Sequence, residues 1–264
     1  MGVRTPSYQA GFYAPERGGR AAYPQLWRGC VGAWNPGIGP SGLVLRDWSG
    51  RKNNGTLTNG PVWSTSTGRQ ALSLDGVNDY IAFPLRSLVT NNFTLSGWFS
   101  TASNSYQYLL AMEGAISPSS GWELLRVDIQ ANRLVSGYVF TGSSNFIGAT
   151  AVPMNVWSHV SFSRSGNVFS LYVNGMLTGS ATYSPSTIAA TAGINDIGAR
   201  RNSPSTLAFS GSVSDVLIHD RALPLSAIKL LAQRPGIAYE LAPRRYYSLP
   251  PSSARLRRIL TGAT

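Results

Sequence analysis

Carboxylates in the middle of the chain are the first side chains that could do chemistry. Glycoside hydrolysis uses two carboxyl groups, and one strand presents both on the same face only when they are an even number of residues apart. Glu123 and Asp128 are five residues apart, so a regular strand would point them to opposite faces. Glu113 has no carboxylate close to it in the sequence. We therefore find no hydrolytic pair and expect the protein not to be an enzyme.

The two histidines and the single cysteine offer other reactive groups. His159 falls within an expected strand, where a packed or hydrogen-bonded structural histidine is the ordinary role. His219 precedes Asp220, which could orient its imidazole, but no serine or cysteine nucleophile motif accompanies the pair. Cys30 is expected to be a small buried residue, and one cysteine cannot form an intramolecular disulfide.

The elements that would position such residues are almost all β-strands. The side chains of residues 93–100 alternate between the two faces of an expected strand, with Phe93, Leu95 and Phe99 on one face. Residues 156–163 alternate in the same way. Further strands are expected near residues 30–34, 70–75, 78–83, 106–112, 122–128, 133–140, 169–173, 194–199 and 206–219. About a dozen short strands at this spacing indicate a two-sheet sandwich or jelly roll.

Two local signals predict a turn and a helix within this pattern. Asn174-Gly175 follows one alternating run and precedes another, which is the signal of a type I′ hairpin turn. Residues 225–233 are the segment that we expect to be helical, because Pro224 suits a first turn and apolar residues recur at helical spacing.

Six motifs occur in order between residues 26 and 232. They are pieces of residues 31–57, then 68–81 (GRQALSLDGVNDYI), 93–98 (FTLSGW), 157–160 (WSHV), 171–175 (LYVNG) and 209–223. Together they resemble laminin-G-like, concanavalin A-like jelly-roll domains. The resemblance implies an all-β fold, a two-sheet antiparallel jelly-roll sandwich (concanavalin A-like) with one short C-terminal helix. This fold carries lectins, hydrolases, adhesion modules and virion proteins, so it does not decide the function.

A calcium site is a further implication of the resemblance. Jelly rolls of this kind often hold calcium between the Asp-Gly turn and an aspartate of the closing strand, and calcium binds several oxygen ligands. Asp75, Asn78 and Asp79 would supply the first side. On the second side the aligned residue is Ser214, and Asp215 comes one residue later, which on a regular strand is the other face. The alternative is a turn in which the Asp75 carboxylate accepts backbone N–H groups. No other cofactor is expected.

Aromatic side chains on neighbouring expected strands could form a carbohydrate site. Such a site needs flat aromatic faces beside hydrogen-bonding side chains. The residues that we single out are Tyr106, Tyr108, Trp122 and Tyr138. The alternative is that these rings pack in the core or on a sheet face, as most aromatic residues of a sandwich do.

The charge of the chain is concentrated at its two ends. The formal net charge is +11, from 22 Lys and Arg against 11 Asp and Glu, and only 12% of the residues are charged. All of the basic residues except Lys52 and Lys229 are arginine. Residues 1–25 carry a net charge of +2 and residues 232–264 a net charge of +5, so the ends hold seven of the eleven excess charges. The middle of the chain is therefore weakly charged.

These ends are expected to be extended basic arms. We divide the chain into an N-terminal arm (1–25), a jelly-roll domain (26–232) and a Pro/Arg-rich C-terminal arm (233–264). Spaced prolines disfavour helix in both arms, and arginine with aromatic residues is typical of protein interfaces. The residues expected to anchor a partner are Arg4, Tyr8, Phe12, Tyr13, Arg17, Arg20, Arg244, Arg245, Tyr246, Tyr247, Arg255, Arg257 and Arg258.

A weakly charged sandwich with two basic arms resembles virion proteins of tailed bacteriophages. We expect a capsid decoration or cement protein that forms a homo-oligomer on the particle and whose arms bind other virion proteins, above all capsid subunits. The alternative is a lectin-like adsorption protein on a phage head or tail appendage that binds a host glycan. Nucleic-acid binding by the arms comes third, because the basic residues are spread over two ends and no recognition fold is present.

The expected location is the virion. The first residues lack the apolar core of a signal peptide, and no run of about 18 apolar residues occurs, so we expect synthesis in a host cytoplasm without secretion or membrane association.

Overall fold

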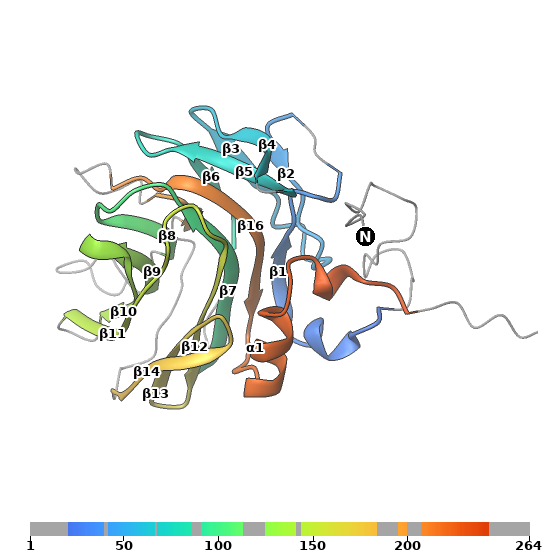
Figure 1. Cartoon of the computed structure of the whole chain (residues 1–264). Coiled ribbons are helices and arrows are strands. Elements are labelled where there is room, and N and C mark those ends of the chain that lie inside the picture. The colour runs from blue at the N-terminus through green and yellow to red at the C-terminus, as the bar shows by residue number, and fades with distance from the viewer. Residues whose placement is uncertain are drawn as a thin grey trace, which may run out of the picture.

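The computed structural model describes residues 21–39, 42–66, 68–85, 91–112, 125–140, 144–183, 195–199 and 207–242. Two antiparallel sheets are stacked face to face, and one short helix lies outside them (Figure 1). We call the sheet beside the helix the back sheet and the other the front sheet. The predicted all-β sandwich with one short helix near the C-terminus is confirmed.

In the described part of the chain, the back sheet has eight strands. In spatial order they are β14 (Met176–Thr182), β13 (Val168–Val173), β12 (Ser158–Ser165), β7 (Asn92–Thr101), β16 (Ser210–His219), β5 (Arg69–Asp75) and β4 (Val62–Ser66), while β1 (Cys30–Trp34) pairs with β16. The predicted turn at Asn174-Gly175 joins β13 to β14, and both residues have positive φ, 50° and 76°, as a type I′ turn requires.

The front sheet, over the same described ranges, also has eight strands, of which β8 to β11 lie on the left in Figure 1. In spatial order they are β11 (Ser144–Ala151), β10 (Leu134–Phe140), β9 (Leu125–Gln130), β8 (Gln107–Met112), β15 (Asn195–Ile197), β6 (Tyr80–Ala82), β3 (Gly55–Thr58) and β2 (Val44–Leu45). Short 3₁₀ turns occur at η2 (Pro24–Leu26), η3 (Ala131–Arg133) and η4 (Ile237–Tyr239).

The main core fills the space between the sheets. Phe93, Leu95 and Phe99 of β7 all lie in it, which confirms their predicted alternation. Phe162 of β12 packs against Phe93 with ring centroids 6.0 Å apart. The alternation predicted for residues 156–163 holds from β12 onward, whereas Val156 precedes that strand and is half exposed.

A second apolar cluster joins the helix to the outer face of the back sheet. Helix α1 (Leu225–Leu231) buries Ala227, Ile228 and Leu231, and the Trp98 indole of β7 donates a hydrogen bond of 3.2 Å to the carbonyl oxygen of Leu231. The helix ends two residues before the predicted limit, at residue 231, because the chain leaves helical geometry shortly after Ala232.

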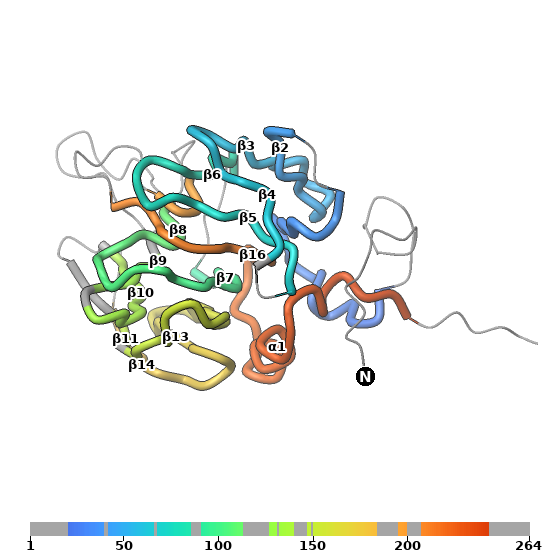
Figure 2. Tube along the Cα trace, turned by 45° about the horizontal axis from the view of Figure 1, so that its top comes forward, coloured from blue at the N-terminus to red at the C-terminus, as the bar shows by residue number. Residues whose placement is uncertain are grey.

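The segments at the two ends of the described chain lie side by side beyond α1 (Figure 2). Ala21 forms an antiparallel bridge with Leu241, and the Ala22 N–H donates a hydrogen bond of 2.7 Å to the Glu240 carbonyl oxygen. Residues 21–25 and 233–242, which the sequence places in the arms, therefore pack against the body. Within the described ranges, we find no helix with the length and apolar character to cross a membrane.

Candidate functional site

The outer face of the front sheet brings together polar and aromatic side chains from three neighbouring strands. Strand register places Tyr108 of β8 opposite Asp128 of β9, and Asp128 opposite Ser136 of β10. Val127 and Ile129, on either side of Asp128, lie in the core, so Asp128 points to the outer face. These three residues form one row across the face.

Asp128 is the centre of a hydrogen-bond network on this face. Its carboxylate accepts the hydroxyl of Tyr106 at 3.0 Å through one oxygen and the hydroxyl of Ser136 through the other. Gln130 donates to Ser136 at 3.1 Å. Hydroxyl donors on a carboxylate hold both partners in place, because charge-assisted hydrogen bonds are stronger than neutral ones. Tyr106 is thereby fixed at the end of β8.

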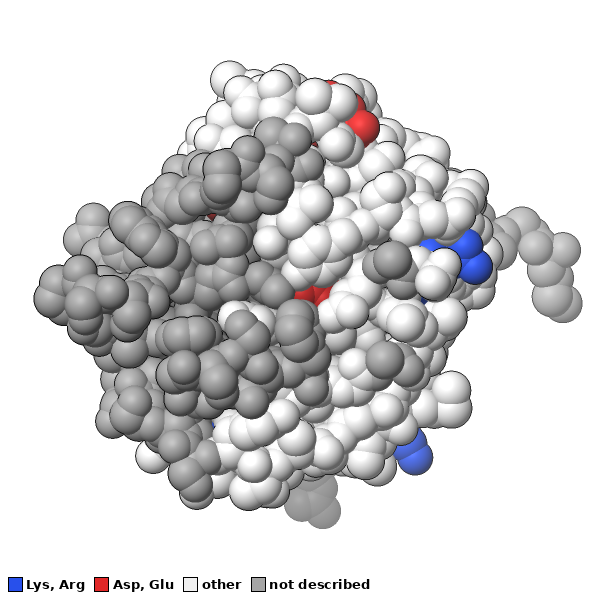
Figure 3. Space-filling model, turned by 90° about the vertical axis from the view of Figure 1, so that its left-hand side faces the viewer, with Lys and Arg blue, Asp and Glu red and all other residues white. Residues whose placement is uncertain are grey.

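A second acidic residue lies in the next row of the same face. Asp196 of β15 pairs with Ala111 of β8, and the row continues across β9 to Tyr138 of β10. Asp128 and Asp196 are both almost fully buried. Figure 3 looks onto this side of the molecule and shows acidic atoms near the middle of the face. The face therefore contains carboxylates and tyrosines, residue types that bind sugar hydroxyls, and both carboxylates are covered in this structure.

The residues predicted for carbohydrate binding fall partly on this face. Tyr106 and Tyr108 meet edge to face with ring centroids 5.4 Å apart, and Tyr106 is half buried. Tyr108 and Tyr138 are 3% and 5% exposed, so their rings are packed in this structure. Trp122 lies outside the described residues. Tyr106 is the described tyrosine of this group that keeps the most exposure.

Sequence reasoning missed Asp128 as a site residue. It considered Asp128 only as a partner for Glu123, whereas in the structure Asp128 is bound by Tyr106 and Ser136. The alternation of Val127, Asp128 and Ile129 is the sequence signal that could have placed Asp128 on the outer face. Its partners come from register between β8, β9 and β10, which no local pattern in the sequence specifies.

The residues predicted to bind calcium do not come together at one place. The Asp75 carboxylate accepts the N–H groups of Val77 and Asn78 at 2.8 and 3.3 Å, and the Asp79 carboxylate accepts the N–H of Asp75 at 3.0 Å. These hydrogen bonds lower the pKa of Asp75. Burial raises the pKa of Asp79. The loop thus has the hydrogen bonds of the alternative that we considered, a turn closed by the Asp75 carboxylate.

Asp215 lies toward the opposite end of β5 from this loop. The register pairs Ser210 with Asp75 and Val213 with Leu72, so Asp215 is about 17 Å farther along the sheet at about 3.3 Å per residue. Asp215 has a φ of 48° within a bulge of β16. No group of three or more His, Cys, Asp or Glu residues forms a metal site in the part of the chain that the structure describes. Calcium binding by this loop stays a prediction.

Asp215 instead lines a small pocket of about 10 Å³ between the back sheet and the segment after α1. Its carboxylate accepts the Gly236 N–H and a hydrogen bond from the Asn35 side chain. Burial raises the pKa of Asp215 to about 7, although the Gly236 N–H and the charge of Arg69 oppose the shift. The second carboxylate oxygen and the hydroxyl of Tyr239 are buried without a protein hydrogen bond.

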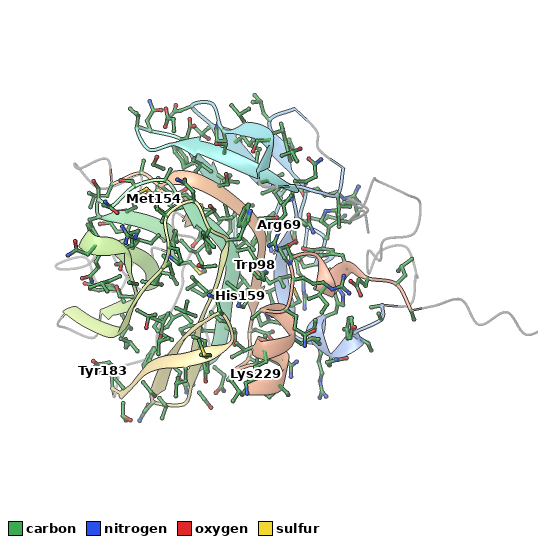
Figure 4. The ribbon with its side chains drawn as sticks, in the orientation of Figure 1. Arg69, Trp98, Met154, His159, Tyr183 and Lys229 are labelled. Carbon is green, nitrogen blue, oxygen red and sulfur yellow. The ribbon has the colours of Figure 1, made fainter. Side chains whose placement is uncertain are left out.

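His159 lines the same pocket from β12. Its ring packs against Trp98 with centroids 5.5 Å apart, and burial lowers its pKa to about 3. The Arg69 guanidinium lies 5.0 Å from the centroid of Trp98 on the other side. Figure 4 shows Arg69, Trp98 and His159 following one another along the back sheet. A neutral His159 packed against Trp98 agrees with the structural role expected from the sequence.

His219 and Cys30 are also enclosed by the body of the protein. His219 makes its hydrogen bond, 2.7 Å, through Nε2 to the Leu26 carbonyl oxygen, and burial lowers its pKa to about 4. Burial raises the pKa of the Cys30 thiol, which donates to the Gly32 carbonyl oxygen. Neither side chain has the environment of a nucleophile or a general base at neutral pH. The residues predicted to anchor a partner all lie outside the described residues.

Comparison with known proteins identifies similar sequences and folds. A family model described as the concanavalin A-like lectin/glucanases superfamily matches residues 75–229. This match covers more than half of the chain and includes four of the six motifs in full. No curated protein matches the sequence.

Several solved structures share the fold at low identity. Domain 4 of AbnA, a GH43 extracellular arabinanase from Geobacillus stearothermophilus, in complex with arabinotriose, is 18% identical with a TM-score of 0.60, over 77% of this chain and 98% of that one. The binding domain of Paraclostridial Mosquitocidal Protein 1 is 16% identical with a TM-score of 0.61, over 79% of this chain and 52% of that one. Trypanosoma rangeli sialidase with sialic acid is 19% identical with a TM-score of 0.59, over 78% of this chain. The chain spans only 33% of that sialidase.

Proposed function

Because the chain belongs to the concanavalin A-like lectin/glucanases superfamily, we propose that it is a non-catalytic carbohydrate-binding domain. The ligand would lie on the outer face of the front sheet, over strands β8, β9 and β10. The superfamily contains lectins as well as glucanases, so the choice between binding and hydrolysis has to come from the residues of the site.

The observation that carries the proposal is the hydrogen bond between the Tyr106 hydroxyl and the Asp128 carboxylate. It fixes an aromatic ring that remains partly exposed beside an acidic acceptor. Sugars present an apolar ring face and a set of hydroxyl groups, and a fixed tyrosine next to carboxylates matches both features. Because the ring is already fixed by Asp128, binding would cost little further loss of side-chain entropy.

The solved relatives support the same assignment. The arabinanase domain, which this chain matches over nearly its whole length, was solved in complex with arabinotriose. The sialidase was solved with sialic acid, but this chain matches only a third of it. Both similarities fall below 20% identity, so they support the proposal through the fold and do not identify the sugar.

A glycan array with the full chain tests the proposal. We expect binding to a defined set of oligosaccharides, reduced at least tenfold by Tyr106→Ala. Tyr172→Ala is the matched control, because Tyr172 is also half buried but lies on β13 of the back sheet. Trp122→Ala tests the predicted residue outside the described ranges. Silence of the wild type across bacterial and host glycans would overturn the proposal, as would equal binding by the Tyr106 and Tyr172 variants.

A second candidate function is attachment of this domain to a larger assembly, for which we propose a virion with capsid subunits as partners. The observation that favours it is that the two ends of the described chain, from which the basic segments continue in the sequence, are paired through Ala21 and Leu241. Deletion of residues 1–20 or 243–264 should release the protein from purified particles while leaving its melting temperature unchanged. Particles that retain both shortened proteins at normal occupancy would contradict this candidate.

A further inference from the structure

Five neighbouring strands at one end of the sandwich carry almost no charge. Residues 134–195 contain a single charged residue, Arg164, although 12% of the whole chain is charged. Arg164 is 1% exposed, and its guanidinium lies 5.2 Å from the ring centroid of Phe169. Strands β10 to β14 all come from this stretch. These strands therefore contribute no exposed charge to the surface of the protein.

Both sheets end on this side of the molecule. Strand β14 is the last strand of the back sheet and β11 the last strand of the front sheet. The two lie together at the lower left of Figure 1, away from the segment after α1. They approach so closely that a Cβ added to Gly179 of β14 would overlap the backbone of Gly148 of β11. The core is closed here by backbone, and strand edges face outward.

The edge of β14 is open. In the described part of the chain β14 pairs with β13 alone, and none of its seven residues is buried. Met176 and Leu177 are 67% and 56% exposed. A bulge at Thr178 leaves residues 179–182 in regular register with residues 168–171. An edge strand of this kind presents unpaired backbone N–H and C=O groups to a further strand.

The opposite edges of the two sheets have the features that usually prevent such pairing. Proteins protect exposed edges with proline, charged side chains or very short strands. Strand β4, at the other edge of the back sheet, follows Pro61 and pairs with β5, which carries Arg69 and Asp75. Strand β2, at the other edge of the front sheet, has two residues and precedes Arg46. Strand β14 has seven residues, with neither proline nor charge.

The absence of charge favours a second copy of this chain as the partner. Each copy carries a net charge of +11, so two copies repel one another least where neither presents charge. An acidic protein would find no basic group to bind at this edge. An edge is also complementary to itself about a twofold axis. We propose that two copies pair antiparallel through β14, so that their back sheets form one continuous sheet. The proposal depends neither on a sugar ligand nor on a virion partner.

The alternation of β14 limits the register of this pairing. Ala181 packs against the core, so Ser180 and Thr182 point to the outer face of the back sheet. Residues directly opposite each other in an antiparallel pair share a face. Pairing centred on residues 179–182 therefore places Ser180 opposite either Ser180 or Thr182 of the partner subunit. In both registers the two Ser180 side chains lie within about 8 Å of each other. The two front sheets then lie on the same side of the joined sheet.

Sedimentation equilibrium of the full chain, at about 1–100 μM, tests the proposal. We expect a dimer, and we expect Ser180→Lys to weaken dimerisation at least tenfold because the two introduced ammonium groups would face each other. Thr65→Lys is the matched control. It also replaces an exposed hydroxyl residue on an edge strand of the back sheet and adds the same charge, but on β4. This control should stay within twofold of the wild type. Circular dichroism melts confirm that each variant is folded.

A cross-linking experiment reports on the edge directly. Ser180→Cys should cross-link to its copy with a short bismaleimide, whereas Thr65→Cys should not. The native thiol of Cys30 is buried and does not compete for the reagent. This measurement does not depend on how far the lysine substitutions disturb the strand.

The salt dependence of the dimer tests the argument from charge. Raising the salt from about 50 to 300 mM should tighten the dimer, because screening weakens the repulsion between two copies of net charge +11. A dimer that salt weakens would be held by opposite charges, which would overturn pairing through an uncharged edge. A wild type that stays monomeric at the highest concentration would also overturn the proposal, as would equal effects of the substitutions at Ser180 and Thr65.

Discussion

The indole Nε1–H of Trp27 and the carbonyl oxygen of Ala238 are joined by a hydrogen bond of 2.7 Å, although 211 residues of sequence separate them. Trp27 follows the η2 turn, and Ala238 lies in the η4 turn, so the contact closes the domain from its two ends. The pairing of the two ends of the described chain is therefore determined by tertiary packing.

Substitution Trp27→Phe should loosen this closure. Phenylalanine keeps an aromatic ring beside Tyr239 but removes the donor to Ala238, which should cost about 1 kcal/mol in the free energy of unfolding. Hydrogen exchange should show faster exchange of the Tyr239 and Glu240 amides, which are bonded within the η4 segment. Urea unfolding measures the stability change.

Trp63→Phe is the matched control for that substitution. The Trp63 indole donates a hydrogen bond of 2.8 Å to the Gly42 carbonyl oxygen, far in sequence from either end. Its loss should leave the exchange of the η4 amides unchanged. Equal acceleration in both variants would mean that the effect is global, and the role of Trp27 in holding the two ends of the described chain together would have to be abandoned.

Asp215 should make stability depend on pH around neutrality. Burial raises its pKa to about 7 in the folded state, whereas in the unfolded chain it titrates near 3.8. The folded form therefore holds the extra proton between these values. Its contribution to stability is complete below about pH 4 and is lost as the pH rises through 7.

The variant Asp215→Asn isolates this contribution, because asparagine keeps an acceptor for the Gly236 N–H and cannot ionise. We expect the free energy of unfolding of the wild type, relative to the variant, to fall by a few kcal/mol between about pH 4 and pH 7 and to stay constant above it. Urea unfolding of both proteins across this range is the measurement. A constant difference between them would show that Asp215 is ionised throughout.

His159 should change the pH dependence of stability in the direction opposite to Asp215. Burial against Trp98 lowers its pKa from 6.5 to about 3, so the folded state keeps it neutral while the unfolded chain is protonated. Its contribution is present above about pH 6.5 and is lost as the pH falls toward 3. His159→Gln should therefore flatten the acid side of the stability profile. Burial also lowers the pKa of His219, so the contribution of His219 to the pH dependence of stability should persist in the variant.

The contributions of Asp215 and His159 have opposite signs and should cancel between about pH 4 and 6.5, so the wild type should keep the rise in stability with pH that comes from His219. Asp215→Asn should make this rise about twice as steep, and in His159→Gln the rise from His219 should be offset by Asp215. Single variants that both keep the wild-type slope would contradict this opposition.

Local sequence patterns predicted where the strands lie in the sequence better than they predicted which residues the strands bring together. Phe93, Leu95 and Phe99 lie in the core as their alternation requires, and Asn174-Gly175 forms the predicted turn. Both features depend only on side-chain direction and on backbone preferences of adjacent residues. The helix was predicted two residues too long, since its end depends on how the following chain packs against the back sheet.

The candidate site required information that local patterns do not contain. Asp128 meets Tyr106 and Ser136 through the register of three strands. Asp215 turns away from the Asp75 loop and into a buried pocket because β16 has a bulge with Asp215 at φ 48°. Register and bulges follow from cross-strand packing, which a single sequence specifies only through the whole fold.

Close approach of the two sheets depends on a glycine opposite an aromatic ring. Gly137 of β10 faces the Phe162 ring so closely that an added Cβ would overlap it. Gly137→Ala should therefore destabilise the protein by about 1–3 kcal/mol, because neither sheet can move without disturbing the core. Differential scanning calorimetry or urea unfolding measures the loss.

A double-mutant cycle with Phe162→Leu tests the cause of that loss. Leucine is smaller than phenylalanine, so the combined variant should be more stable than the sum of the two single losses by about 0.5–3 kcal/mol. Gly166→Ala provides the comparison, since an added Cβ there meets no atom within 4 Å and its cost comes from a φ of +60°. The loss of stability from Gly166→Ala should add to the loss from Phe162→Leu, with no interaction energy between the two substitutions. Additive losses for Gly137 as well would show that backbone preference, not the facing ring, requires glycine at this position.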